Sequence, residues 1–176
     1  MITPDVIDIY KEVILSPEFK RLKNVSFLGI LGYSLLEPRT ISSRYDHSIA
    51  VADMCFNFCR SKDMSYEDTT YITLAGILHD VGHPCFSHSL EAIFKEKCGI
   101  EHHKVTRQLV LFSSSLDIIW KKYNIDPIHI VDIIEGDSTS IVTKIPFNFD
   151  TLDGIYRTES HFKSNLDTKD TIQIIY

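Results

Sequence analysis

Apolar residues recur every three or four positions through most of the chain, a spacing that predicts α-helices rather than strands. Runs of glycine, proline and serine separate these stretches and indicate where each helix ends. The pattern predicts helices over residues 16–28, 42–60, 67–80, 87–98, 101–112, 116–120, 126–134 and 147–157. It predicts loops over residues 29–41 and 136–143, and leaves residues 171–176 as a strand or a frayed end.

Several predicted helix ends carry residues that favour a cap. Ser16 precedes Pro17, an order typical of an N-cap followed by the first helical turn. Ser42 or Ser43 can cap the next helix. Glycine is favoured just after a helix end, so Gly99 is the expected cap at the end of the helix over residues 87–98. For the helix over residues 87–98 we expect an inward face made of Leu90, Ile93 and Phe94.

Length and composition indicate one globular domain. The chain has 176 residues, of which 44% are apolar and 24% are charged, ordinary values for a protein with a single core. We therefore predict one all-α domain, a compact helical bundle spanning residues 1–176 with its core over about residues 10–160.

Charge and hydropathy exclude several classes of function. The net charge of −6 gives no general basic field for a nucleic-acid backbone, so an anionic small ligand needs local positive charge. No apolar stretch is as long as a membrane span, and the N-terminus lacks a basic region followed by an apolar one. The four cysteines form no CxxC pair, which favours reduced thiols. We expect a cytoplasmic protein without membrane or nucleic-acid binding.

The chemistry of the chain centres on His79 and Asp80. They lie where an apolar helical run meets Gly82, and buried ionisable groups need a partner or a metal. His47 and Asp150 can join them, and imidazole and carboxylate together suit a divalent cation. Such a set leaves positions open for water and substrate.

Each residue also has a structural explanation. His47 can be a hydrogen-bonded helix residue, Asp150 can cap the helix that follows it, and His83 and His88 can make local contacts in a loop. The metal hypothesis accounts for all of them together, whereas the structural explanation treats each as a separate coincidence.

Four segments carry a resemblance to a known family. His47, His79-Asp80 and Asp150 resemble the H…HD…D signature of the HD-domain phosphohydrolase superfamily. The segments 44–48 (Arg-Tyr-Asp-His-Ser) and 79–88 (His-Asp-Val-Gly-His-Pro-Cys-Phe-Ser-His) look like two blocks of its deoxynucleoside triphosphate triphosphohydrolase branch. Segments 16–22 and 150–157 resemble two further blocks, so the resemblance covers about residues 10–160.

The resemblance implies roles for ten residues. It implies metal ligation by His47, His79, Asp80 and Asp150. It implies catalytic positions beside a phosphate for His83, His88 and His102. Substrate contacts are expected from Arg44, His103 and Tyr156. The third catalytic histidine belongs to a family segment in which a histidine is followed four residues later by a serine. If His102 is that histidine, Thr106 stands at the position of the serine hydroxyl. The neighbouring His103 leaves open an alignment shifted by one residue.

The implied function is hydrolysis of a nucleotide phosphoester, with a deoxynucleoside triphosphate as one candidate. The cofactor is one divalent ion, from among manganese, iron, nickel, cobalt, zinc and magnesium. Gly154 and Thr158 stand where the branch has tyrosine and aspartate, so the resemblance names no particular nucleotide. The alternative is a weak or inactive HD-domain module that binds nucleotide or metal for regulation. The oligomeric state stays open, a homo-oligomer included.

Overall fold

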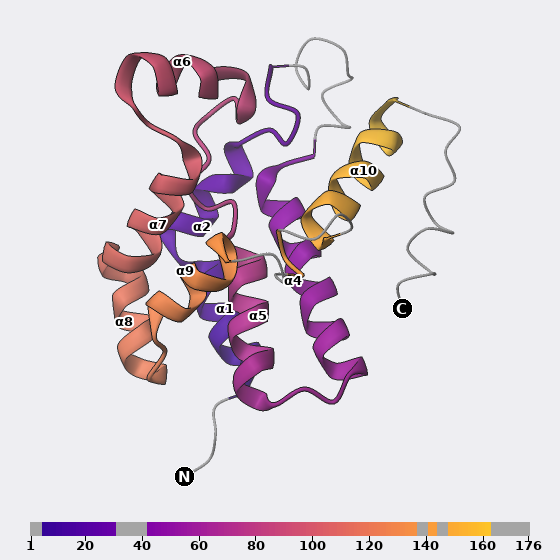
Figure 1. Ribbon diagram of the computed structural model, residues 1–176, viewed down its shortest axis with the longest axis vertical. Coiled ribbons are helices and arrows are strands. Elements are labelled where there is room, and N and C mark those ends of the chain that lie inside the picture. The colour runs from indigo at the N-terminus through magenta and orange to yellow at the C-terminus, as the bar shows by residue number, and fades with distance from the viewer. Residues whose placement is uncertain (1–4, 31–41, 137–140, 144–147, 163–176) are drawn as a thin grey trace.

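The fold is all-α, as predicted. The computed structural model describes residues 5–30, 42–136, 141–143 and 148–162 (Figure 1). In the described residues the only β-type pairing is an isolated bridge between Ser26 and Ser43. The helices are α1 (Val6–Leu15), α2 (Pro17–Lys20), the 3-10 helix η1 (Arg21–Asn24), α4 (Arg44–Ser61), α5 (Tyr66–Leu78), α6 (His88–Cys98), α7 (His102–Phe112), α8 (Ser114–Tyr123), α9 (Pro127–Glu135) and α10 (Phe149–Phe162).

The predicted caps are confirmed where the structure describes them. The Ser16 side chain accepts a hydrogen bond from the Phe19 amide, with Pro17 at the start of α2. Ser43, rather than Ser42, caps α4 and forms a reciprocal capping box with Asp46. Gly99 ends α6 in the left-handed conformation, with φ of 66°.

The N-terminal region differs from the prediction. The sequence pattern did not identify α1, which buries Val6, Ile9 and Val13 along one face. The helix predicted over residues 16–28 ends at Asn24, because the following backbone pairs with the segment before α4. Val25 is extended, its carbonyl accepts from the Arg44 amide at 2.8 Å, and the Phe27 amide donates to the Ser42 carbonyl at 2.9 Å.

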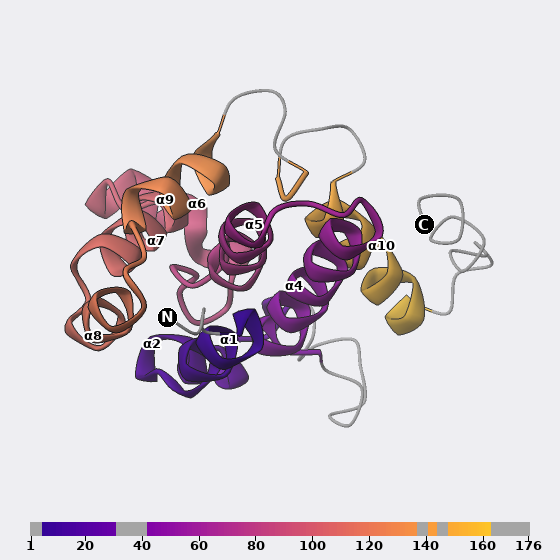
Figure 2. The ribbon, with the colours of Figure 1, turned by 90° about the horizontal axis from the view of Figure 1, so that it is seen from below.

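Helices α4 and α5 form the centre of the molecule (Figure 2). On one side α10 lies against α4, and on the other α7, α8 and α9 lie beyond α5. Gly76 permits close packing of the central pair, since a Cβ there would lie 3.1 Å from the Ala52 Cα and 2.9 Å from the Cys55 sulfur. One buried apolar cluster includes residues from α1, α2, α4, α5, α7, α8, α9 and α10. The single-domain boundary stays a prediction.

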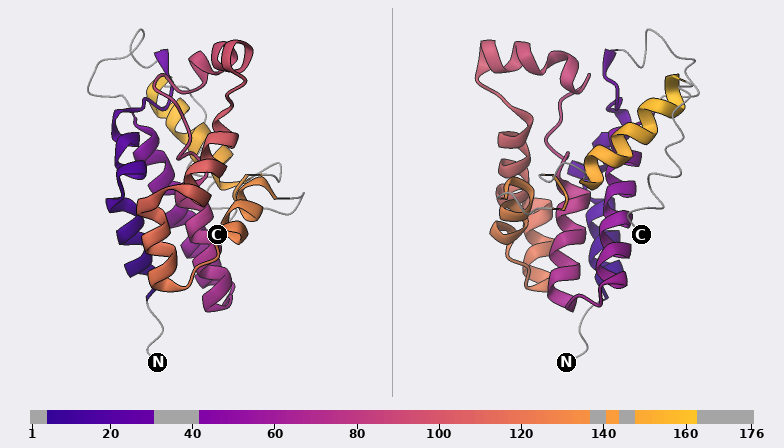
Figure 3. Two further views of the ribbon diagram at one scale, coloured as in Figure 1. Left: turned by 90° about the vertical axis from the view of Figure 1, so that its left-hand side faces the viewer. Right: turned by 45° about the vertical axis from the view of Figure 1, so that its right-hand side comes forward.

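Helix α6 projects from this body (Figure 3). None of its residues is buried, and Ile93 is 55% exposed. The predicted inward face is therefore wrong for Ile93 and only partly right for Leu90 and Phe94, because α6 lies beyond the end of α5 and faces the body with one flank. Residues 31–41, 137–140 and 171–176 of the other predictions lie outside the described residues.

Within the described helices, none combines the length and apolar character that a membrane crossing requires.

Candidate metal centre and adjoining histidines

Three helix ends bring the four predicted ligands together. His47 lies in the first turn of α4, His79 and Asp80 follow the last turn of α5, and Asp150 lies in the first turn of α10. The Nε2 atoms of His47 and His79 are 3.3 Å apart. Asp80 Oδ2 lies 3.5 Å from each of these nitrogens, and Asp150 Oδ1 lies 3.1 Å from His47 Nε2 and 3.7 Å from His79 Nε2.

Hydrogen bonds on the far side of each imidazole fix its orientation. His47 Nδ1 lies 2.5 Å from Asp153 Oδ2, and His79 Nδ1 lies 2.8 Å from the Gly76 carbonyl oxygen. Because both acceptors require a proton on Nδ1, we assign the proton to Nδ1 in the neutral rings. The two Nε2 lone pairs then face each other and the two carboxylates. This is the outer-shell arrangement usual for metal-bound histidines.

The charges and hydrogen bonds that converge on this group shift the pKa values of its residues. Burial lowers the pKa of His79, but the charges of Asp80 and Asp150 outweigh it and raise the pKa to about 9. Burial raises the pKa of Asp80, yet His79 and Arg44 hold it well below its ordinary value. The pKa of Asp150 is also lowered, against its burial, by hydrogen bonds from His47 and His79. The group thus favours positive charge at its centre.

These residues fit a divalent cation. His47, His79 and Asp80 are buried and offer ligand atoms within 4.8 Å of one another. Their nitrogen and oxygen donors suit the transition metals, and the Asp150 side chain, 39% exposed, leaves one side open. Asp150 does not cap α10, because the Asn148 side chain accepts from the Thr151 amide at 2.7 Å.

Arg44 lies beside the carboxylates. Its Nη1 is 2.5 Å from Asp80 Oδ2, and its Nε donates to Ser87 Oγ at 2.8 Å. Ser87 adopts a φ of 50°, and Phe86 before it a φ of 66°, conformations that non-glycine residues seldom adopt. This strain turns the buried Ser87 hydroxyl toward Arg44, and backbone strain of this kind is concentrated at functional sites.

The three histidines predicted to be catalytic form a second group next to the first. Ring centroids lie 4.0 Å apart for His83 and His102, which stack, and 4.6 Å apart for His83 and His88. Their ligand atoms also lie within 4.8 Å of one another, so this group too can hold a metal ion. Burial lowers the pKa of His83 to about 4, so the His83 ring is neutral near pH 7, and burial also lowers the pKa of His102.

Glu91 joins this group and was missed from the sequence. Its carboxylate lies 2.7 Å from His88 Nδ1 and also accepts from His102 Nδ1. The signal available was its position three residues after His88 on a predicted helix, which places both on one face. In the first group, Asp153, three residues after Asp150, was likewise not predicted as a site residue.

The structure separates His102 from His103. His102 is buried, whereas His103 is exposed, with ring centroids 3.9 Å apart. Thr106 accepts from the Gly82 amide at 2.9 Å through its hydroxyl oxygen, which ties the first turn of α7 to the loop after Asp80. His102 thus stacks on His83, and the choice of catalytic histidine between His102 and His103 stays a prediction.

Tyr156 and Arg21 lie outside both groups. Tyr156 is 42% exposed on α10, and no described contact joins it to either group. Arg21, not predicted to act here, donates to the backbone oxygens of Val81 and His83 and so holds the loop that carries His83.

Comparisons with known proteins show the family to which the chain is similar. A family model described as HD domain matches residues 44–154, more than half of the chain. The uncharacterised protein MJ1154 of Methanocaldococcus jannaschii is 31% identical over 99 residues, 56% of this chain and 20% of that protein. Deoxynucleoside triphosphate triphosphohydrolase SAMHD1 of Danio rerio is 29% identical over 89 residues, 47% of this chain and 14% of that protein.

A solved structure extends the likeness to the fold. The crystal structure of a hypothetical protein from Aquifex aeolicus superimposes with a TM-score of 0.72 at 26% identity, covering 89% of this chain and 43% of that one. In all three comparisons the match covers less than half of the other protein.

Proposed function

The chain belongs to the HD-domain family, and we propose on that basis that it is a metal-dependent phosphohydrolase acting on a nucleotide. The observation that carries the proposal is the convergence of two imidazole nitrogens and two carboxylates, His47, His79, Asp80 and Asp150, on one point. A divalent ion held there would supply a Lewis acid and a water of lowered pKa.

The surrounding residues would act on the phosphate. Arg44 carries a permanent positive charge beside Asp80 and can offset charge on a bound phosphate. His83, His88 and His102, with Glu91 orienting two of them, would exchange protons with the phosphate and the leaving oxygen. His103, exposed beside His102, and Tyr156 stay predicted substrate contacts.

A nucleotide is the substrate that the site supports best. The protein has a net charge of −6, so the arginine and histidines are a local exception that suits a small anion. The SAMHD1 relative is named as a deoxynucleoside triphosphate triphosphohydrolase, which makes such triphosphates the first substrates to test. The cytoplasmic location, the metal's identity and the oligomeric state stay predictions.

One feature favours the alternative, a module that binds without turnover. The Phe27 ring lies 4.7 Å from the His47 ring, and the Arg44 guanidinium lies 4.7 Å from the same phenyl ring. Phe27 thus covers one flank of the metal group. Gly154, where the similar enzymes have tyrosine, offers no side chain on that flank.

Metal content and product analysis test the proposal. Purified protein should contain a divalent metal, and it should release phosphate, pyrophosphate or triphosphate from a nucleotide panel supplied with Mn, Mg, Co or Ni. His79→Gln and Asp80→Asn should lose both metal and turnover. His129→Gln is the matched control, because His129 stacks on Tyr71, two turns before His79.

The outcomes separate the two functions. Release of a phosphate species that disappears in both variants supports the enzyme, and the species released identifies the bond. Metal-loaded protein that binds nucleotides yet releases nothing supports the regulatory module. Absence of metal binding in the wild type would refute both.

A further inference from the structure

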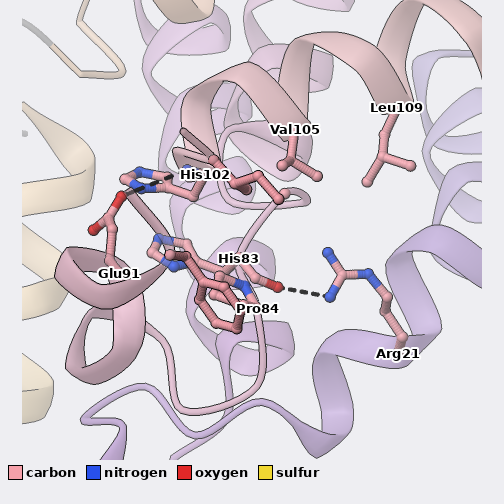
Figure 4. Close-up of a pocket in the computed structure, with 10 residues that line it drawn as sticks. Arg21, His83, Pro84, Glu91, His102, Val105 and Leu109 are labelled. Carbon is pink, nitrogen blue, oxygen red and sulfur yellow. Dashed lines mark hydrogen bonds and ion pairs between the residues drawn. The ribbon is translucent and has the colours of Figure 1, made fainter. Parts of the chain in front are cut away.

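Two cavities differ in how their polar groups are used. The larger, of about 370 Å³, adjoins His83 and His102 (Figure 4). There Arg21 already binds backbone oxygens and Glu91 already pairs with imidazoles, so this cavity belongs to the site described above. The smaller, of about 230 Å³, shares no lining residue with that site and contains polar groups that lack partners.

The smaller cavity lies between α1, α4 and α5 (Figure 2). Its lining residues are Val6, Ile7 and Tyr10 from α1, Asp53 and Phe56 from α4, and Thr73 from α5. Asp53 and Ile7 are exposed whereas Thr73 is buried, so the first two form the mouth of the cavity and Thr73 forms its floor. Ligand pockets usually measure about 300–1,000 Å³, so the occupant is smaller than most ligands.

The hydroxyl at the floor has no hydrogen-bond partner. Thr73 is only 3% exposed, yet its Oγ1 makes no hydrogen bond within the described residues. The other threonines of α5, Thr69 and Thr70, each donate to the carbonyl oxygen four residues earlier at 2.8 Å. Buried hydroxyls nearly always have a partner. The Thr73 hydroxyl can therefore bond to a polar atom of a molecule inside the cavity.

The carboxylate at the mouth has no positive charge beside it. Asp53 Oδ1 accepts a long hydrogen bond of 3.4 Å from the Tyr10 hydroxyl, and no lysine or arginine of the described residues pairs with it. Partial burial raises the pKa of Asp53 despite that hydrogen bond, so the surroundings stabilise the carboxylate poorly. The rings of Tyr10 and Phe56 also line the cavity, and aromatic faces attract cations. A cation at the mouth would thus be stabilised.

We propose that this cavity binds a short aliphatic amino alcohol, with its ammonium group at Asp53, its hydroxyl at Thr73 and its hydrocarbon chain along the apolar wall. The polar groups of such a molecule match the order found in the cavity, an anion at the mouth and a neutral hydroxyl at the floor. A second charge at the floor would be costly, because Thr73 is buried and Asp53 is the one carboxylate that lines the cavity.

Titration of aminopentanol into ¹⁵N-labelled protein tests the proposal. Amide shifts are expected at Tyr10, Phe56 and Thr73, which come from the three helices around the cavity. Pentylamine lacks the hydroxyl and pentanediol lacks the charge, so each probe removes one of the two polar contacts. Both should bind more weakly than aminopentanol.

Two variants remove the matching groups of the protein. Asp53→Asn should weaken aminopentanol binding by about tenfold or more, because a hydrogen bond to a charged group is lost. Thr73→Val, which has nearly the same shape, should weaken it by about two- to tenfold. Asp132→Asn is the matched control, because Asp132 is exposed on α9 and does not line the cavity. It should leave binding unchanged.

Each variant should affect the probes selectively. Pentylamine should lose affinity in Asp53→Asn but not in Thr73→Val, and pentanediol should show the reverse. Thr73→Val without ligand should unfold at the same urea concentration as the wild type or a higher one, because the hydroxyl that it removes has no partner.

Three results would overturn the inference. The first is a set of shifts confined to other residues, or no shifts at tens of millimolar aminopentanol. The second is pentanediol binding as tightly as aminopentanol, which would exclude a role for the Asp53 charge. The third is unchanged aminopentanol binding in both Asp53→Asn and Thr73→Val. None of these measurements requires turnover, so their failure leaves the proposed phosphohydrolase function unaffected.

Discussion

Gly82→Ala should be the most informative single substitution in the loop that carries His83. A Cβ on Gly82 would lie 2.3 Å from the His102 carbonyl oxygen, 2.3 Å from the Thr106 amide nitrogen and 2.6 Å from the Thr106 hydroxyl. Two of these atoms are backbone in the first turn of α7 and cannot rotate away. Either the loop or α7 must therefore move.

The cost follows from two effects. Forcing a methyl group into a filled space costs about 1–3 kcal/mol. Displacing the buried hydrogen bond from the Gly82 amide to Thr106 adds about 1–3 kcal/mol. Together these give an expected loss of roughly 2–6 kcal/mol in the free energy of unfolding, a large share of the usual total of about 5–15 kcal/mol.

Urea unfolding followed by circular dichroism measures this loss. Gly154→Ala is the control, because a Cβ there meets only Phe27 Cζ at 3.5 Å. Within the helix α10 it should stabilise the protein by about 0.5–1 kcal/mol. Nucleotide turnover in folded Gly82→Ala should fall further than its metal content, since His83 follows Gly82 whereas His79 and Asp80 precede it. A Gly82→Ala protein within about 1 kcal/mol of wild type would refute the close packing of loop and α7.

Three further predictions concern the ionisable groups. Asp153→Asn should weaken metal binding by about 10–100-fold, because the carboxylate orients His47, and calorimetric titration that shows unchanged affinity would contradict this. Added metal at 100 times its Kd should stabilise the wild type by about 2.7 kcal/mol in thermal unfolding, and His79→Gln should abolish this gain; an equal gain in both would place the ion elsewhere. Burial alone would raise the pKa of Glu91, but hydrogen bonds from His88 and His102 lower it to about 2. The ionised carboxylate therefore stabilises the fold above its ordinary pKa of 4.5, and this contribution is lost as the pH falls toward 2. The difference in unfolding free energy between wild type and Glu91→Gln should shrink on acidification from pH 6 to 3, and a difference that grows would refute the pairing.

The sequence was most informative where ionisable residues stand in an apolar segment that is expected to be buried. His79 and Asp80 stand at the end of an apolar helix, and that conflict directed attention to the group the structure assembles. Glu91 and Asp153 create no such conflict, since a charged residue on a helix usually faces solvent. Only the fold reveals that Glu91 lies between two histidines eleven residues or fewer away along the chain.

Helical periodicity found the elements but not always their surroundings. It identified the apolar face of α6, yet it could not indicate that little of the protein lies opposite that face. The same pattern missed α1, whose ten residues give a short signal before the first proline-marked start. Arg21 was missed because its partners are backbone oxygens about sixty residues away. The sequence does not indicate which backbone oxygens accept a side-chain hydrogen bond.

The position of Arg21 determines whether the complete site can be transferred to another protein. The HD family match begins at residue 44, but α1, α2 and η1 contribute Ile9, Phe19 and Leu22 to the buried cluster, and Arg21 to the loop before His83. Residues 44–154 transplanted onto another helical protein would carry every proposed metal ligand. They would lack Arg21, which holds the loop that carries His83. The grafted protein should therefore bind metal but misplace the histidines beside the metal group.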